Sequence, residues 1–301
     1  REDPPLDDLI QMAFEAKQAT LRGDGTRGRW LSPLKTHVSP KIGRRRVSTL
    51  TKSDFHDVLR PIWKTQHPTA EKVYTRLRYA IEFGQIAGFD CDPIEVLRAQ
   101  KMLGHYDHQV SHIVATPWQE IPPLYQRLEG QGFVAACLQF MILTLVRSHG
   151  CRQARFTEFG PGLWVVPGDR IKSKKNTVSD FHVPMSIEAE RLIDQQRNYS
   201  TDVVFPGHRG KPISDNALSM FLNRIDEPGR PHGFRTSFAT WAQDTDACPW
   251  DVRETILGHS IGGKVERSYA RSDLLDRRRP VMEAWARYVT GKAENVVAIG
   301  R

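Results

Sequence analysis

The feature that most constrains the fold is an apolar segment near the middle of the chain, residues 132–146, which reads GFVAACLQFMILTLV. A helix that is apolar on every side must be buried on every side. The segment is shorter than the roughly 18 apolar residues that a membrane-spanning helix needs. It therefore predicts the central helix of a globular domain, and we expect no membrane span.

Helical and strand patterns alternate around this segment. The runs 163–167 (LWVVP) and 181–184 (FHVP) are rich in β-branched and aromatic residues and predict a β-hairpin, and 203–206 predicts a short strand. Helices are predicted over 118–129 after a Thr116-Pro117 start, over 187–197, from a Ser214 cap to 225, over 250–257 and around Trp285 and Tyr288. The second half of the chain is therefore expected to be a mixed α+β domain.

The first 103 residues carry helical patterns only. We expect helices over 7–19, over 48–60 with Thr51 as the cap and Asp54 three residues later, and over 69–87. The apolar face of the third helix is predicted to consist of Val73, Leu77, Ala80, Ile81 and Ile86. Residues 104–117 resemble a linker, so we predict a helical domain over 1–103 and a second domain over 118–301.

The linker contains His105, His108 and His112, which raises the question of a metal site. No carboxylate or cysteine arrangement nearby completes a recognisable ligand set, so we interpret the segment as a plain linker without a metal. The four cysteines are widely spaced and include no C-x-x-C pair. This spacing indicates neither a zinc site nor a disulfide framework, and we expect reduced thiols in a cytoplasmic protein.

The chain is basic. It has 43 Lys and Arg against 35 Asp and Glu, a net charge of +8 and a pI near 9.4. This balance favours a polyanionic partner, most simply nucleic acid. The tip of the predicted hairpin carries Arg170, Lys172, Lys174 and Lys175. The residues that we expect to contact DNA lie in the helical domain and on this tip: Lys41, Arg44, Arg45, Arg46, Lys72, Arg76, Arg78, Lys174 and Lys175.

The last fifth of the chain carries the candidate chemistry. His232 and Arg235 form an H-x-x-R step whose members share one face if the segment is a helix, Gly258-His259 ends the next apolar run, and Tyr269 follows ten residues later. An arginine, two imidazoles and a phenol together suggest phosphoryl transfer with Tyr269 as the nucleophile. No phosphate loop, H-E-x-x-H motif or acidic pair for Mg²⁺ occurs, so we expect no ATP, metal or other cofactor.

The order of these motifs resembles the tyrosine recombinases, also called phage integrases, and in particular the integrases of satellite phages and genomic islands. The resemblance covers nearly the whole chain. It is carried by LTLVRS, the LWVVPGDRIK hairpin, HVPMS, FPGHRGKPISDNALS, HGFRTSFATW, LGH and SYAR in the second half, and by PKIGRRRVSTLTKSDFHDVLRPIW in the first.

The resemblance implies a role for each residue of the site. The family's first arginine falls on Arg147, with Arg152 as its rival; Arg147 is preferred because LTLVRS matches directly and because Phe156 and Glu158 then follow where the family has W-x-D/E. The chain departs from the family at Gly150, where a bracing Glu is usual. The family's hairpin lysine falls on Lys172, with Lys174 and Lys175 as alternatives, and the remaining catalytic positions fall on His232, Arg235, His259 and the nucleophile Tyr269.

The resemblance also implies a fold and a function. The fold would be an all-α core-binding domain, a SAM-like helical bundle, followed by a mixed α+β catalytic domain with a small antiparallel sheet. The enzyme would be a bacterial cytoplasmic, nucleoid-associated recombinase that is a monomer in solution and a tetramer on double-stranded DNA, working through a four-way (Holliday) junction with accessory DNA-bending and excision proteins. Its C-terminal residues would dock on a neighbour, and a small N-terminal arm-binding domain is expected to be missing from this sequence.

Two other interpretations of the sequence remain open. A type IB-like topoisomerase uses the same tyrosine chemistry but reseals the same strand. A catalytically inactive DNA-binding regulator would bind a site without cutting it, and Gly150 is its one support.

Overall fold

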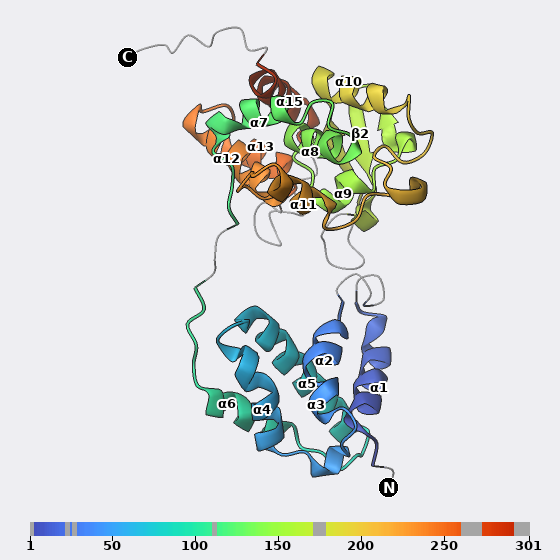
Figure 1. The fold of residues 1–301 in the computed structure, drawn as a ribbon, viewed down its shortest axis with the longest axis vertical. Coiled ribbons are helices and arrows are strands. Elements are labelled where there is room, and N and C mark those ends of the chain that lie inside the picture. Colours follow the sequence, from blue (N-terminus) through green and yellow to red (C-terminus); the bar gives the residue numbers. More distant parts are fainter. Residues whose placement is uncertain are drawn as a thin grey trace. The chain divides into compact units, whose positions relative to one another are not determined.

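The computed structural model describes residues 3–21, 25, 29–109, 113–170, 179–259 and 273–291. The described residues form two compact units, one ending at residue 109 and one starting at residue 113 (Figure 1). Each unit has its own hydrophobic core. No described helix is both long and apolar enough to cross a membrane.

The elements described in the first unit are helices, and one isolated bridge joins Pro5 and Arg46. The helices are α1 (Leu6–Gln18), α2 (Ser32–His37), α3 (Ser39–Ile42), α4 (Lys52–Trp63), α5 (His67–Ile86) and α6 (Pro93–Leu103), with a 3-10 turn η2 (Val47–Thr49) before α4. The start predicted for α4 is confirmed, because the carboxylate of Asp54 accepts the backbone N–H of Thr51 at 2.9 Å. Helix α4 packs against α5 and α6, and α5 also packs against α1 and α2.

The apolar face predicted for α5 is confirmed except at its end. Val73, Leu77 and Ile81 are buried, but Ile86 is 86% exposed. Ile86 comes five residues after Ile81 and is therefore about 140° around the helix from it. The core-facing residue at this level is Gly84, where a Cβ would lie 2.9 Å from a methyl group of Leu9 in α1. The close approach of α1 leaves room only for glycine there.

The described ends of segment 104–117 are attached to the two units. The indole N–H of Trp63 donates to the carbonyl of Gly104 at 3.2 Å, and the ring of Tyr106 lies against that of His67. In the second unit, Thr116 was expected to cap a helix, and this is wrong. Its hydroxyl donates to Glu227 at 2.9 Å in the core, and the chain enters a 3-10 turn, η3 (Trp118–Glu120), before α7 (Ile121–Arg127).

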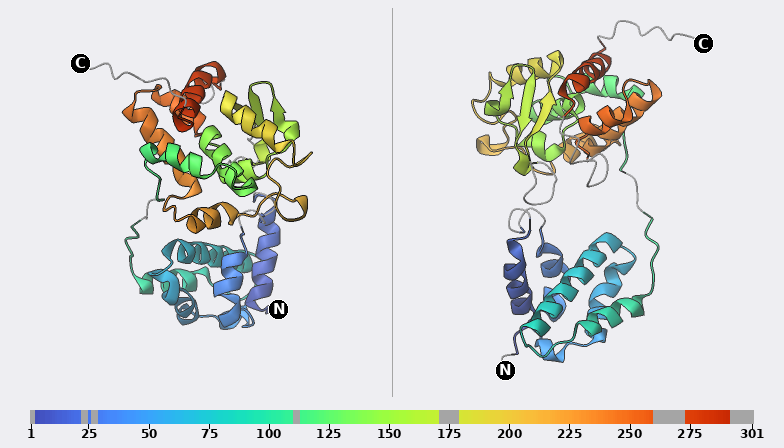
Figure 2. Two further views of the ribbon diagram at one scale, coloured as in Figure 1. Left: turned by 45° about the horizontal axis from the view of Figure 1, so that its top comes forward. Right: turned by 180° about the vertical axis from the view of Figure 1, so that it is seen from behind.

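Helix α8 (Phe133–Thr144) is the centre of the second unit, as the sequence predicts. Every residue from Ala135 to Thr144 is buried. Helices α10 (Ile187–Gln196), α11 (Ala217–Arg224), α12 (Phe234–Asp244) and α15 (Leu275–Val289) pack against it (Figures 1 and 2). The buried indole of Trp285 in α15 donates to the carbonyl of Ile142 at 2.8 Å. This bond ties the last described helix to the central one.

The predicted hairpin forms, with one strand added. Strands β1 (Phe159–Gly160), β2 (Leu163–Val166) and β3 (Phe181–Pro184) make an antiparallel sheet in that order, with Trp164 opposite Val183. The strand predicted over 203–206 is wrong, because this segment makes only isolated bridges. Val204 and Phe205 are fully buried as a loop that packs on the core, and Pro206 has no N–H for a ladder.

The other predicted helices of the second unit form, including α13 (Trp250–Ile256). Ser214 does not cap α11, which begins at Ala217 without a side-chain cap; the backbone carbonyl of Ser214 accepts the Ala217 N–H at 3.2 Å. The short helices are α9 (Ser148–Arg152), η4 (Phe156–Glu158), η5 (Gly168–Arg170), η6 (His208–Gly210) and η7 (Pro231–Gly233). All four cysteines are free.

Two separate cores predict two thermal transitions. Asp54→Ala removes the cap of α4 and should cost about 1 kcal/mol in the first unit. Trp285→Phe removes a buried hydrogen bond and should cost about 1–3 kcal/mol in the second. In scanning calorimetry each variant should lower one transition by a few degrees and leave the other in place. If both variants lower the same transition, the two cores unfold together and the prediction is wrong.

Candidate active site

Arg147 is placed by a reversal of the chain after α8. The helix ends at Thr144, and Leu145 takes a left-handed conformation with φ of 60°. A fully buried Leu with positive φ is a strained arrangement that the surrounding packing must hold. The chain then extends through Arg147, which is half-buried, into the short helix α9.

Arg235 connects two helix ends. It lies in the first turn of α12 and is only 6% exposed. Its Nη1 donates to the carbonyl of Leu145 at 2.5 Å, and its Nη2 donates to the carbonyl of Leu257. Leu145 follows α8 and Leu257 follows α13, so both acceptors are carbonyls at helix C-termini, which have no partner within their own helices.

His259 joins the same cluster. Its Nε2 lies 3.1 Å from Nη2 of Arg235, and its Nδ1 lies 2.7 Å from Oε2 of Glu254 in α13. Gly258 before it has φ of 59°, a conformation that glycine adopts without strain. The chain reversal at Gly258 brings the imidazole of His259 back toward the C-terminal end of α13.

Arg147 lies beside this cluster. A Cβ on Gly258 would be 3.9 Å from Nη1 of Arg147 and 3.6 Å from the ring of Phe181. Both side chains therefore lie next to Gly258, the residue that precedes His259. Burial, and then the charge of Arg147, lowers the pKa of Arg235 to about 10. Arg235 therefore remains charged at neutral pH. Guanidinium groups do not lose their proton in proteins, so two positive charges face one partly buried location.

Arg152, the alternative candidate for the family's first arginine, has its contacts elsewhere in the domain. It is 4% exposed, its Nη1 donates to the carbonyl of Ile213 at 2.6 Å, and its Nη2 is paired with Asp215. These contacts attach α9 to the segment before α11. At Gly150, a Cβ would lie 2.7 Å from a methyl group of Val146, so this backbone leaves no space for the Glu that the family usually has.

His232 and Arg235 differ in environment. His232 is exposed in the 3-10 turn η7, whereas Arg235 is buried in α12. A three-residue spacing places two residues on one face only within a continuous α-helix. Here the 3-10 turn η7 ends and α12 begins between His232 and Arg235, so the spacing does not apply. Lys172, Lys174, Lys175 and Tyr269 lie outside the described residues.

Arg170 was expected with the lysines on the extended tip of the hairpin, and this is wrong. It is mostly buried, and its Nη1 donates to the carbonyl of Gln153 at 2.6 Å and to Glu158 at 2.5 Å. Glu158 also accepts the indole N–H of the buried Trp164 at 3.0 Å. Arg170 therefore attaches the base of the hairpin to the domain.

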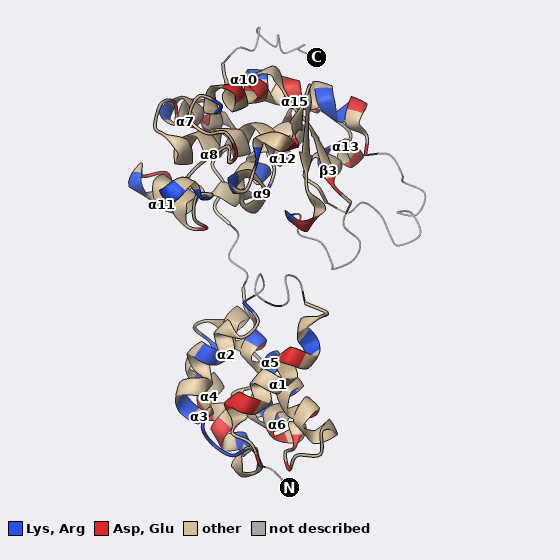
Figure 3. Ribbon diagram, turned by 90° about the vertical axis from the view of Figure 1, so that its right-hand side faces the viewer, with Lys and Arg blue, Asp and Glu red and all other residues tan. Residues whose placement is uncertain are grey.

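Lys and Arg residues occur on several helices of the first unit (Figure 3). The predicted DNA-binding residues among them differ in their contacts. Arg44 and Lys72 are exposed. Arg76 is half-buried and donates to the carbonyl of Trp30 at 2.5 Å, and burial lowers its pKa. The other exposed side chains have contacts within the unit: Lys41 with the carbonyl of Asp57, Arg45 with Asp54, Arg46 with the carbonyl of Asp3, and Arg78 with Glu82.

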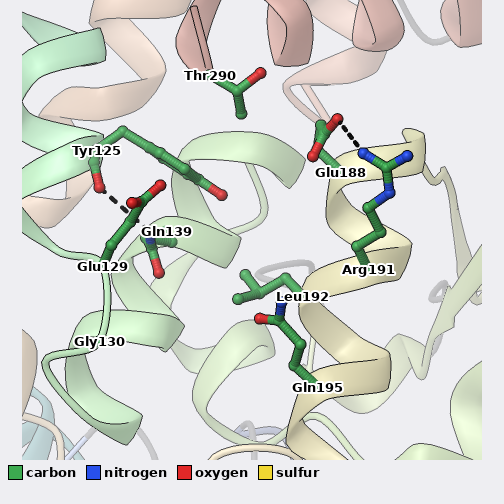
Figure 4. Close-up of a pocket in the computed structure, with 9 residues that line it drawn as sticks. All are labelled: Tyr125, Glu129, Gly130, Gln139, Glu188, Arg191, Leu192, Gln195 and Thr290. Atoms are coloured by element: carbon green, nitrogen blue, oxygen red, sulfur yellow. Dashed lines mark hydrogen bonds and ion pairs between the residues drawn. The ribbon is translucent and has the colours of Figure 1, made fainter. Parts of the chain in front are cut away.

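A cavity of about 450 Å³ lies between α7, α8 and α10, away from the cluster of Arg147, Arg235 and His259 (Figure 4). Its wall includes Tyr125, Glu129 and the ion pair of Glu188 with Arg191. None of the arginines or histidines of the cluster lines it. Among the described residues, no three His, Cys, Asp or Glu side chains are grouped to hold a metal ion.

Two family models match the chain. The phage integrase central domain matches residues 7–94, and the phage integrase family matches residues 118–274, just over half of the chain. This chain belongs to the phage integrase family. The two models fall on the two units of the fold.

Curated relatives agree with this membership. Prophage integrase IntZ of Escherichia coli K12 is 27% identical over 269 residues, which are 85% of this chain and 64% of that protein. Prophage integrase IntA of the same strain is 32% identical over 159 residues, which are 50% of this chain and 37% of that protein. The chain thus spans less than two thirds of the length of these curated relatives.

The solved structures show the fold. A lambda integrase dimer bound to a COC' core site matches with a TM-score of 0.65 at 13% identity, covering 90% of this chain and 78% of that one. The Tn1549 transposon integrase in complex with circular intermediate DNA matches with a TM-score of 0.58 at 12% identity, covering 89% and 98%. The expected integrase fold, two domains with a small antiparallel sheet in the second, is confirmed.

The paired arginines predict anion binding. Sulfate at ten times its Kd should stabilise the second unit by about 1.4 kcal/mol, seen as a higher melting temperature. Arg147→Gln should abolish this specific shift, because one of the two facing charges is lost. Sulfate also stabilises proteins in general, so Arg191→Gln, at an arginine paired with Glu188, serves as the control and should keep the full shift. An equal shift in both variants would contradict anion binding at the cluster.

Proposed function

We propose that this chain is a site-specific DNA recombinase that cuts and rejoins DNA through a 3′-phosphotyrosine to integrate and excise a mobile element. The observation that carries the proposal is the pair of charged arginines, Arg147 and Arg235, at one partly buried place beside His259. Membership of the phage integrase family supports it.

The arginines would bind the scissile phosphate. A DNA phosphodiester is an anion that repels nucleophiles, and its non-bridging oxygens gather charge in the pentavalent transition state. Guanidinium groups hold such oxygens through planar, charge-assisted pairs of hydrogen bonds. Because Arg235 is already held in place by two carbonyls, it would stabilise this charge without reorganisation during the reaction, and Arg147 would add a second positive charge beside it. His259 would hydrogen-bond a phosphate oxygen.

The remaining roles complete the exchange. The phenol oxygen of Tyr269 would attack phosphorus, the bond from phosphorus to the 5′ oxygen would break, and His232 would accept the phenol proton. Lys172 would give a proton to the leaving 5′ oxygen. A free 5′-hydroxyl from another strand then reverses these steps. One phosphoester bond replaces another, so the exchange consumes no nucleotide cofactor.

The contacts of the rival arginines favour Arg147 as the first arginine of the site. Arg152 is neutralised by Asp215, and its guanidinium is occupied by the Ile213 carbonyl. Arg147 lies next to Gly258, and its charge acts on Arg235. A phosphate held by Arg235 would therefore also meet Arg147.

The partners follow from the same proposal. Two of the solved structures hold a lambda integrase dimer on a core site and a lambda integrase tetramer on a Holliday junction. We propose that this chain clamps double-stranded DNA between a domain over 1–103 and one over 118–301, joined at 104–117. It would act as a tetramer in the bacterial cytoplasm at the nucleoid, with accessory DNA-bending and excision proteins.

Covalent trapping tests the reaction. The protein is incubated with a nicked suicide duplex from the junction of its own element and run on a denaturing gel. We expect a covalent protein–DNA adduct that is absent for Tyr269→Phe and strongly reduced for Arg147→Ala. Retained cleavage in Arg147→Ala would instead favour Arg152. Specific binding without any adduct would point to an inactive regulator, and resealing without strand exchange to a topoisomerase.

DNA binding should depend on salt through the exposed basic residues of the first unit. Arg44→Ala and Lys72→Ala should each reduce the slope of log K against log salt by about 1, because each removes one phosphate contact. Fluorescence anisotropy with a labelled core-site duplex over a salt series measures the slope. Lys101→Ala, at an exposed position on α6 outside the predicted DNA-binding set, is the control and should leave it unchanged. An equal loss in all three variants would contradict the assignment.

A further inference from the structure

The carboxylate of Glu254 is bonded to the imidazole of the candidate site. Glu254 lies in α13, its side chain is 17% exposed, and its Oε2 is 2.7 Å from Nδ1 of His259. Its other oxygen, Oε1, accepts from Nε of Arg253 at 3.2 Å. The backbone N–H of His259 also donates to the carbonyl of Glu254 at 3.0 Å. Ring and carboxylate are therefore held together by both main chain and side chain.

The two neighbours of His259 determine its tautomer. A carboxylate has no proton to give, so Nδ1 must be the donor in the bond to Glu254. A guanidinium has no lone pair to offer, so Nε2 must be the acceptor in the contact with Arg235. In this arrangement the imidazole is neutral, carries its proton on Nδ1, and directs Nε2 toward Arg235.

We propose that Glu254 is a positioning residue for the strand-transfer reaction: it fixes the tautomer and the rotation of His259 in the free protein, so that Nε2 faces the phosphate that Arg235 binds and, once it takes up a proton from solvent, donates to a phosphate oxygen. This inference rests on the proposed function. It adds Glu254 to the site, a residue that lies outside the H-x-x-R, G-H and tyrosine motifs. Partners of this kind set the orientation of functional histidines in many sites.

The charge of Glu254 has a second effect on the site. Arg147 and Arg235 repel each other, and burial disfavours the charged form of both. Glu254 opposes these effects, since its negative charge favours the charged form of Arg235. The neighbouring helix α9 supplies no carboxylate at Gly150, where even a Cβ would meet Val146. Glu254 therefore provides, from α13, a carboxylate next to the arginines.

The tautomer is measured in the free protein by NMR. Ring ¹⁵N shifts of the labelled 301-residue chain report which nitrogen is protonated, and the His259 signals are those missing from His259→Gln. We expect a protonated Nδ1 in the wild type. In Glu254→Gln, whose amide can donate or accept, the population should shift toward protonated Nε2, and Glu254→Asp should restore part of the original state. A wild-type ring protonated only on Nε2 would overturn the inference.

Cleavage of the suicide duplex then tests the effect on the reaction. Glu254→Gln should slow single-turnover cleavage about tenfold with unchanged DNA affinity. In a His259→Ala background the same change should have no further effect, because Glu254 acts through that ring. The control is Asp251→Asn, which removes a carboxylate of the same helix that pairs with Arg277 instead, and it should cleave like the wild type.

The outcomes separate the two proposals. Wild-type cleavage by Glu254→Gln, or an equal further loss in the His259→Ala background, overturns the positioning role even when the enzyme is active. Melting temperatures of all variants show whether any loss arises from unfolding. A wild-type chain that forms no adduct contradicts the proposed recombinase and with it the positioning role in strand transfer, while the NMR result still decides which tautomer Glu254 holds.

Discussion

The candidate site depends on the way in which the protein holds Arg235. The guanidinium is buried and donates to the carbonyls of Leu145 and Leu257, at the C-terminal ends of α8 and α13. Helix C-termini carry partial negative charge and carbonyls without partners in their own helices, so they stabilise a cation there. Two carbonyl dipoles fix the position of Arg235 without neutralising it. A carboxylate paired directly with this guanidinium would compete with the phosphate that we propose it binds.

Arg152 shows the alternative arrangement in the same domain. Its guanidinium also donates to a main-chain carbonyl, but it is paired with Asp215 as well. A neutralised arginine contributes to stability and attracts little further anion. The difference between Arg152 and Arg235 therefore supports the proposal that Arg152 is structural and that Arg235 is available to a phosphate. Holding an unpaired arginine in this place is unfavourable for the folded state. Burial and the charge of Arg147 lower the pKa of Arg235, and Leu145, whose carbonyl accepts from it, has a strained backbone.

The sequence predicted the scaffold better than the contacts within it. The central helix, the hairpin and the Thr51 cap with Asp54 three residues later follow from local periodicity and turn chemistry, and these were correct. The choice between Arg147 and Arg152 depends on the left-handed turn at Leu145, which no local pattern signals because Leu rarely adopts it. Thr116 was assigned wrongly because its partner, Glu227, is 111 residues away in the chain.

Glu254 was missed for a related reason. A Glu in the last turn of a short helix usually indicates a solvated charge, and its five-residue spacing from His259 corresponds to no regular helical face. The spacing becomes informative only because Gly258 reverses the chain after α13 and returns the imidazole to the carboxylate. A Glu that precedes a Gly-His helix end by four residues is thus a pattern that sequence reading could use. It joins a conformational requirement at the glycine to a chemical one at the histidine.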